Sequence, residues 1–338
     1  MRKYGKSVSR ALAAILILCA VKVQAKEIVS LPGDPISFVL DYNTKGELVY
    51  DLSYKGVKLI EQSPIGMNNA DGVSYTPENF KIELVGTSGE SGTLTPVWGK
   101  RSMMNKHYIQ KSYQITPLYP LTNEHNTPPR VYLEVRVYEG AVAFRYRCVL
   151  PQPSHEPFVP VNTIIENTKF NFAGDFTAWY YNGERHNIGP ELLSRASGER
   201  LPVMTIKAKD NIYMAIHEAD VNEKALPMRL QTEQGSTSFS VVTEPLDFQT
   251  KYISPWRVIL LGETPGALVD SDVLTLLNPE PAKGMDFSWV KPGIALWDWR
   301  INGAEWDGYR YGMNYDSWVR MVDFASEQGF AYLFYSPP

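Results

Sequence analysis

The chain has 338 residues, 44% of them hydrophobic and 12% aromatic, with a formal net charge of −4. This composition supplies a large core, and the length favours one large domain followed by a partial one. No basic cluster follows residue 10, so we expect no nucleic-acid partner. The 20 tyrosines and 8 tryptophans fit two roles: filling β-sheet cores, or stacking on weakly charged ligands such as sugars.

The first 25 residues have the pattern of a signal peptide. Its basic start comprises Arg2, Lys3, Lys6 and Arg10. The apolar run over 11–21 is too short to span a membrane, and Val23–Ala25 fits a cleavage site. We therefore expect an exported protein, periplasmic or secreted, with no transmembrane span and a mature chain starting near Lys26. Only Cys148 then remains, which excludes an intrachain disulfide and predicts a small buried apolar residue.

The chain from Lys26 to about Met285 predicts strands without helical periodicity. Alternating or apolar runs predict strands over 36–42, 47–54, 57–60, 204–207, 212–217, 237–242 and 256–261. The clearest hairpin joins 131–138 to 142–148 through Glu139-Gly140. Short strands separated by Gly, Pro and Asn turns favour a two-sheet sandwich.

The last part of the chain predicts a different fold. The composition changes over 272–292, which we interpret as a connector. A strand over 293–297, a helix from 314–317 to Gly329, and a strand over 330–334 follow. The apolar positions of this helix are Trp318, Met321, Val322 and Ala325. Strand, helix and strand in this order indicate the opening of a β/α fold.

Short motifs lie along the whole chain. In order they are Tyr54–Gly56 with Leu59–Glu61, Val137–Tyr146, Phe172–Asp175 with Ala178–Tyr180, Tyr213–Ala219, Pro255–Arg257, Ser288–Gly293 with Trp297–Arg300, and Val322–Phe330. Together they resemble the motifs of glycoside hydrolase family 97, exported bacterial enzymes that act on α-glucosides or α-galactosides. The resemblance covers nearly all of the expected mature chain.

The resemblance implies an N-terminal β super-sandwich, a catalytic (β/α)₈ barrel and a small C-terminal sandwich. We therefore expect a mainly β chain: a large β super-sandwich over 26–285, then an incomplete barrel fragment (β-α-β) over 286–338. A full barrel takes roughly 250 residues, so we expect the chain to be truncated. The final stretch, Ala331–Pro338, also lacks the acidic strand end of the family.

The activity implied by the resemblance is hydrolysis of α-linked oligosaccharides by a calcium-dependent α-glycosidase. Hydrolysis needs two carboxylates across the scissile bond, and in the family these come from later barrel strands. We therefore expect no catalytic residues here and no activity from this chain alone. Pairing Asp298 with Glu305 or Asp307 is disfavoured, because so short a unit would not hold them rigidly.

Two other functions remain open: a non-catalytic carbohydrate-binding or relic β-sandwich, and a structural sandwich without a ligand. Glucoside or galactoside specificity, and inversion or retention, are not decided by these residues.

A calcium ligand is also implied by the resemblance. In the family, a glutamate of the sandwich joins barrel carboxylates around the ion. By position, Glu191 is the first candidate and Glu184 the second; the alternative is a loop glutamate without a ligand. His217-Glu218 suggests an acid/base or metal pair, but neighbours on a strand point to opposite faces, so we expect a structural role.

The candidate substrate-binding residues are Asp298, Trp299 and Arg300. They follow a barrel-like strand at its C-terminal edge, where barrel enzymes contact substrates. Trp299 could stack on a sugar while the other two bind its hydroxyls. The alternative is that Trp297 and Trp299 pack under the sandwich, since alternation puts both on one face and Asp298 on the other.

Overall fold

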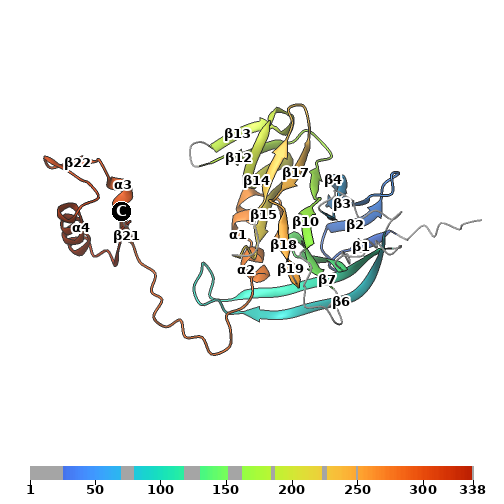
Figure 1. Ribbon diagram of the computed structural model, residues 1–338, viewed down its shortest axis with the longest axis horizontal. Helices are drawn as coiled ribbons and strands as arrows, with labels where there is room; N and C mark the ends of the chain where they lie inside the picture. Colours follow the sequence, from blue (N-terminus) through green and yellow to red (C-terminus); the bar gives the residue numbers. More distant parts are fainter. Residues whose placement is uncertain are drawn as a thin grey trace, which may run out of the picture. The chain divides into compact units, whose positions relative to one another are not determined.

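The computed structural model describes residues 26–69, 80–117, 130–150, 162–183, 187–222, 227–248 and 250–336 (Figure 1). The expected signal peptide and Glu184 lie outside these residues. The chain divides into two compact units, the first ending at Pro279 and the second starting at Glu280. This division falls within the connector expected over 272–292. Among the described helices, none has the length and apolar character needed to cross a membrane.

The first unit contains three antiparallel sheets. A four-stranded sheet has the order β1 (Glu27–Val29), β2 (Ile36–Tyr42), β3 (Leu48–Tyr54), β4 (Val57–Pro64). A three-stranded sheet has the order β18 (Leu246–Phe248), β10 (Asn162–Glu166), β5 (Met67–Asn69). The 13-stranded main sheet runs in the order β11 (Lys169–Asn171), β17 (Ser238–Val242), β16 (Arg229–Thr232), β14 (Gly198–Lys209), β15 (Ile212–Ala219), β20 (Trp256–Gly262), β9 (Ala141–Val149), β8 (Arg130–Tyr138), β7 (Met104–Pro117), β6 (Phe80–Leu94). Off this path, β12 (Thr177–Tyr181) pairs with β13 (Asn187–Leu192) and β14, and β19 (Lys251–Ile253) pairs with β9.

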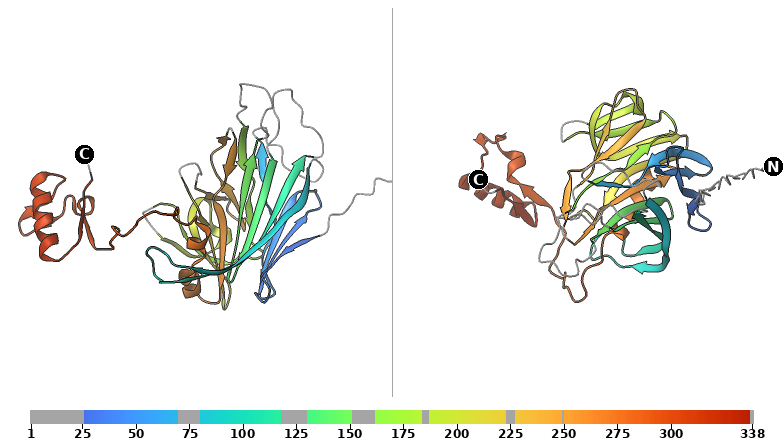
Figure 2. Two further views of the ribbon diagram at one scale, coloured as in Figure 1. Left: turned by 90° about the horizontal axis from the view of Figure 1, so that it is seen from below. Right: turned by 45° about the vertical axis from the view of Figure 1, so that its right-hand side comes forward.

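The main core lies between the four-stranded sheet and the main sheet (Figure 2). Phe38 and Tyr50 stack with ring centroids 5.1 Å apart, and Phe144 of β9 lies 5.6 Å from Tyr50. Strand β20 occupies the middle of the main sheet, between β15 and β9, and all seven of its residues are buried. Two sheets around one apolar core confirm the predicted large β-sandwich.

The predicted hairpin over 131–148 is confirmed as β8 and β9. Its turn residue Gly140 has a φ of +69°, and an added Cβ would lie 3.1 Å from the carbonyl oxygen of Leu261. Glycine is therefore required both by the left-handed backbone and by the neighbouring strand. Cys148 ends the alternation as a fully buried free thiol, whose pKa burial raises to about 12.

The expectation of strands alone up to Met285 is wrong at two short helices, α1 (Pro265–Asp270) and α2 (Val273–Leu277). Each is too short for a helical period to show in the sequence. They bury Leu268, Leu276 and Leu277 in a second core with Trp256, on the outer face of the main sheet.

The long hairpin β6–β7 was not predicted, because its glycine- and serine-rich strand lacks apolar alternation. The turn that joins its strands is tied to the two helices. Lys100 Nζ donates to the carbonyl oxygens of Val269 (2.6 Å) and Ser271 (3.2 Å). The Arg101 guanidinium pairs with Asp272 at 3.0 Å.

The second unit confirms the predicted strand, helix and strand. Its elements are β21 (Ala295–Trp297), α3 (Asp298–Ile301), β22 (Glu305–Trp306), β23 (Tyr309–Arg310), α4 (Tyr315–Glu327) and β24 (Tyr332–Phe334). Strands β21 and β24 pair in parallel, and β22 and β23 form a small hairpin. The side chain of Asn314 caps α4 by accepting from the N–H of Ser317 at 3.0 Å. Met321 and Ala325 are buried as expected, whereas Val322 is 50% exposed and lies off the buried face.

Candidate functional site

Asp298 stands at the C-terminal end of β21, where the chain turns directly into α3. Its side chain is only 1% exposed. Both carboxylate oxygens accept from the backbone N–H of Ser336 at 3.1 Å, and Oδ2 accepts from the indole N–H of Trp318 at 3.0 Å. Burial opposes ionisation, but these hydrogen bonds outweigh it and lower the pKa of Asp298. The carboxylate therefore stays charged and joins the end of β24 to α4.

Trp299 and Arg300 form an exposed group beside this buried carboxylate. The rings of Trp297 and Trp299 lie 5.6 Å apart at 30°, and the Arg300 guanidinium carbon lies 5.1 Å from each ring. Phe334 of β24 meets Trp297 edge-on at 5.7 Å. We call Trp297, Trp299, Arg300 and Phe334 the aromatic edge. Trp299 is 50% exposed, so much of its ring is open to a ligand.

The structure thus separates the three predicted substrate-binding residues into two environments. The two indoles share one side and Asp298 faces another, as alternation suggested. The physical reason differs, because β21 ends at Trp297 and Trp299 already belongs to α3. Glu305 is exposed and lies opposite Arg310 on the β22–β23 hairpin, so it is not placed as a catalytic partner of Asp298.

Glu191 lies on β13, directly opposite Ala178 of β12. Its carboxylate accepts a hydrogen bond from the phenol of Tyr180, whose ring also lies 5.0 Å from the guanidinium of Arg200. Burial and the bond to Glu191 raise the pKa of Tyr180 to about 12, so the phenol remains a donor at neutral pH. Glu191 is thus fixed within the hairpin.

The environment of Glu191 does not by itself fit a calcium ion. Calcium takes about six to eight oxygen ligands, and the neighbours described above contribute one carboxylate. Across the described part of the chain, no three His, Cys, Asp or Glu side chains come together in a metal-binding arrangement.

A buried ion cluster in the first unit was not predicted. Arg257 of β20 is fully buried, and its Nε and Nη2 donate to Glu166 of β10 at 3.0 and 2.5 Å. Its Nη1 donates to Glu218 of β15 at 2.9 Å. Burial raises the pKa of Glu218, and the N–H of Met228 also donates to its carboxylate. The one available signal was a charged residue inside an apolar strand, Trp256–Leu261.

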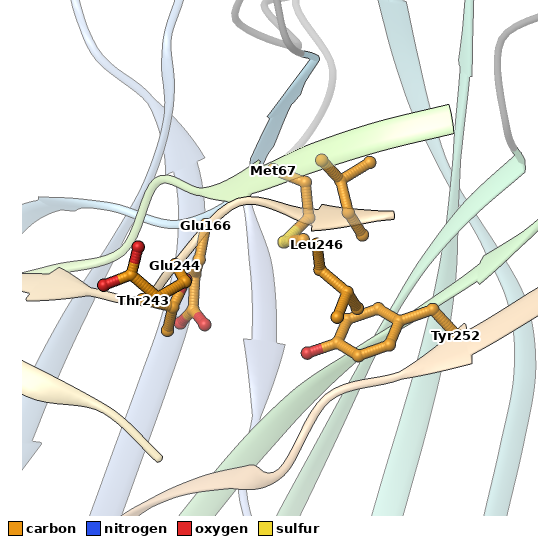
Figure 3. Close-up of a pocket in the computed structure, with 7 residues that line it drawn as sticks. Met67, Glu166, Thr243, Glu244, Leu246 and Tyr252 are labelled. Atoms are coloured by element: carbon orange, nitrogen blue, oxygen red, sulfur yellow. The ribbon is translucent and has the colours of Figure 1, made fainter. Parts of the chain in front are cut away.

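The ion cluster borders a small pocket between the three-stranded sheet and β19. Glu166 and Tyr252 turn their polar ends toward it, and Leu246 and Met67 line its apolar side (Figure 3). It holds little more than one water molecule, which is too small for a sugar. Glu218 is committed to Arg257, while Nδ1 of His217 accepts from the backbone N–H of Glu218 at 2.8 Å. The pair is therefore structural, as expected from alternation.

Comparison with known proteins identifies the family. The family described as Glycosyl-hydrolase 97 N-terminal matches residues 29–280, which is most of the chain. The chain belongs to this family. The family 97 resemblance seen in the motifs is thereby confirmed.

Three relatives place this family 97 chain further. It is 21% identical over 359 aligned positions to the retaining α-galactosidase of Bacteroides thetaiotaomicron, covering 94% of this chain and 51% of that protein. A family 97 enzyme from Pseudoalteromonas sp. strain K8, solved with acarbose, matches with a TM-score of 0.74 and 24% identity, covering 91% of this chain and 46% of that one. A β-arabinopyranosidase matches with a TM-score of 0.68 and 21% identity, covering 91% and 50%. The family 97 chain thus spans about half the length of these relatives, and the structural matches show the fold.

Proposed function

We propose that this family 97 chain forms the sandwich and the first strand, helix and strand of the barrel of an α-glycosidase. The observation that carries the proposal is the order of its parts: a family 97 sandwich is followed directly by a parallel β-α-β unit. The Bacteroides relative is named a retaining α-galactosidase, so α-galactosides are the first substrates to test and α-glucosides the second.

The proposed substrate contacts are Trp299 and Arg300 of the aromatic edge. They lie beyond the C-terminal end of β21, the side on which α/β folds bind ligands. The half-exposed indole offers a stacking surface, and the guanidinium offers hydrogen-bond donors. Asp298 contributes indirectly, because its hydrogen bonds fix the strand ends that carry this edge.

We propose that the acid and the nucleophile or base are supplied from outside the described residues. Asp298 is engaged with Ser336 and Trp318, and Glu166 and Glu218 are held by the buried Arg257. None of these carboxylates is free to face a glycosidic bond across the distance that hydrolysis needs. The chain alone is therefore expected to be inactive.

The test combines an assay with the gene. The purified 338-residue chain is incubated with 4-nitrophenyl α-galactoside and α-glucoside, and release of nitrophenol is expected to equal that of a heat-denatured control. Turnover that grows with protein concentration would show that the chain carries its own acid and base. Sequencing beyond codon 338 should find barrel coding, in frame or after a one-base correction. A true stop with no barrel sequence behind it would refute the enzyme proposal.

Calcium binding is proposed only as a single contribution from Glu191. One carboxylate binds calcium weakly, with a Kd above about 1 mM. Calorimetric titration of the chain with CaCl₂ measures this. A submicromolar Kd, lost in Glu191→Gln but kept in Glu199→Gln, would show a complete site instead.

Export is proposed from the first 25 residues. Mass spectrometry of the protein recovered from its native host should find a mature N-terminus at Lys26. Recovery of the intact N-terminus from a cytoplasmic fraction would refute export.

A further inference from the structure

The outer face of the main sheet is only partly covered. Helices α1 and α2 pack over one half of it. The half formed by β7, β8 and β9 carries side chains that are partly exposed at every second position. Those with aromatic, amide or guanidinium groups are Tyr108, Gln110, Gln114, Tyr132, Arg136, Arg145 and Arg147. We call this half the open face. Rings that stack and planar groups that donate hydrogen bonds together suit hydroxyl-rich ligands.

The side chains of the open face are held in place before any ligand arrives. Arg136 Nε donates to Gln110 Oε1 at 2.6 Å, and its guanidinium carbon lies 4.5 Å from the ring of Tyr108. The rings of Tyr108 and Tyr138 lie 5.2 Å apart. Arg147 lies 3.8 Å from the ring of Tyr132 at the other end. Ordered side chains lose little entropy on binding, which favours recognition by a flat surface.

The charges of the open face are largely compensated within it. Glu134 accepts from Arg145 at 2.8 Å and from Arg147 at 3.3 Å. Burial opposes the charge of Glu134, but the two guanidinium groups outweigh it and lower its pKa. Arg145 also reaches Asp220 at 3.4 Å. A compensated face has little field to attract an acidic ligand, so a neutral one fits better.

One buried donor under the open face lacks a partner. The ring of Trp256 is fully buried, with the guanidinium carbons of Arg145 and Arg136 at 4.3 and 4.8 Å from its centroid. Its indole N–H finds no acceptor among the described residues. Leaving a buried donor unsatisfied costs about 1–3 kcal/mol. An oxygen from outside the protein, from water or from a bound hydroxyl, is needed to satisfy it.

We propose that the open face binds a neutral oligosaccharide, with Tyr108, Gln110 and Arg136 at one end and Tyr132 and Arg147 at the other. Tyr132 and Arg136 lie four residues apart on β8, or about 13 Å, which exceeds a single sugar ring. An oligosaccharide should therefore bind better than a monosaccharide. This site does not depend on the proposed catalytic function, because it uses no residue of the second unit.

Saturation-transfer NMR and calorimetry on the 338-residue chain test the proposal, with stachyose, maltoheptaose and free galactose as probes. At least one oligosaccharide is expected to bind, and galactose at least tenfold more weakly. Tyr108→Ala is expected to weaken binding about fivefold, whereas Tyr108→Phe keeps the ring and should stay within about twofold. Melting temperatures of both variants show whether a loss reflects unfolding.

The variant Trp299→Ala separates this site from the aromatic edge. If the open face is the site, Trp299→Ala binds like the parent chain and Tyr108→Ala does not. Binding that is lost in Trp299→Ala but kept in Tyr108→Ala would overturn the proposal and support a substrate site on the second unit. Absence of oligosaccharide binding at 10 mM probe, roughly the weak limit of such contacts, would also overturn it.

Discussion

Arg257 is the side chain whose loss should damage the sandwich most. It is fully buried and donates to two glutamates, Glu166 and Glu218, on different strands. Arg257→Ala leaves both carboxylates in the interior without a cation. Removing one partner of a buried ion pair typically costs about 3–5 kcal/mol. Because two carboxylates are stranded here, we expect a loss near the upper end, about 5 kcal/mol.

Arg229 supplies a matched control within the same sandwich. It also binds two glutamates, Glu199 at 2.8 Å and Glu244 at 3.1 Å, but its side chain is 35% exposed. Water solvates its partners after truncation, so Arg229→Ala should cost about 0–1 kcal/mol. The two variants remove the same chemical group with similar numbers of hydrogen bonds and differ mainly in burial.

Urea unfolding at pH 7, followed by tryptophan fluorescence, measures both losses. Trp256 neighbours Arg257 on the same buried strand and should report its transition. An Arg257→Ala variant that unfolds at the urea concentration of Arg229→Ala would refute the argument from burial. In that case water or local rearrangement would already be solvating the two carboxylates.

Three smaller effects follow from local geometry. Gly140→Ala should lose about 1–2 kcal/mol, because its Cβ would meet Leu261; Gly56→Ala, with a similar φ of +75° and open space, should lose less in the same urea titration. Asn314→Ala removes the cap of α4 and should cost about 1 kcal/mol, seen as an earlier helical melt by circular dichroism; an unchanged melt would contradict the cap. Glu134 has a lowered pKa, so its stabilisation is present above its ordinary pKa and is lost as pH falls through the lowered value. The gap in unfolding free energy between the parent and Glu134→Gln should therefore be wide at pH 7 and narrow by about pH 3; a constant gap would exclude the linkage.

Local periodicity was sufficient to predict much of the fold. The β8–β9 hairpin and the final strand, helix and strand each carry a complete signal: alternation or helical spacing, with a turn residue or a cap at the boundary. The β6–β7 hairpin carries none, because exposed Gly, Ser and Thr residues fill a strand that buries little. Helices α1 and α2 are shorter than two helical turns, so tertiary packing rather than periodicity stabilises them.

The candidate site was less predictable, because its contacts join residues far apart in sequence. Asp298 was predicted as a sugar ligand from its place at a strand end. Its actual partner is the backbone of Ser336, which only the parallel pairing of β21 and β24 brings near. The Glu166–Arg257–Glu218 cluster likewise depends on strand order, which alternation within each strand does not reveal.

The central place of β20 has a consequence for synthesis. Strands β8 and β9 can pair as soon as they leave the ribosome, but β9 waits for Trp256–Gly262 before its other edge is covered. At about 5–20 residues per second this interval lasts on the order of 10 s. Throughout it, a strand of alternating apolar residues presents unpaired N–H and C=O groups to other nascent chains. The recovery of this protein from cells should therefore depend on how fast residues 150–262 are translated and on which chaperones are present, as much as on the stability of the finished sandwich.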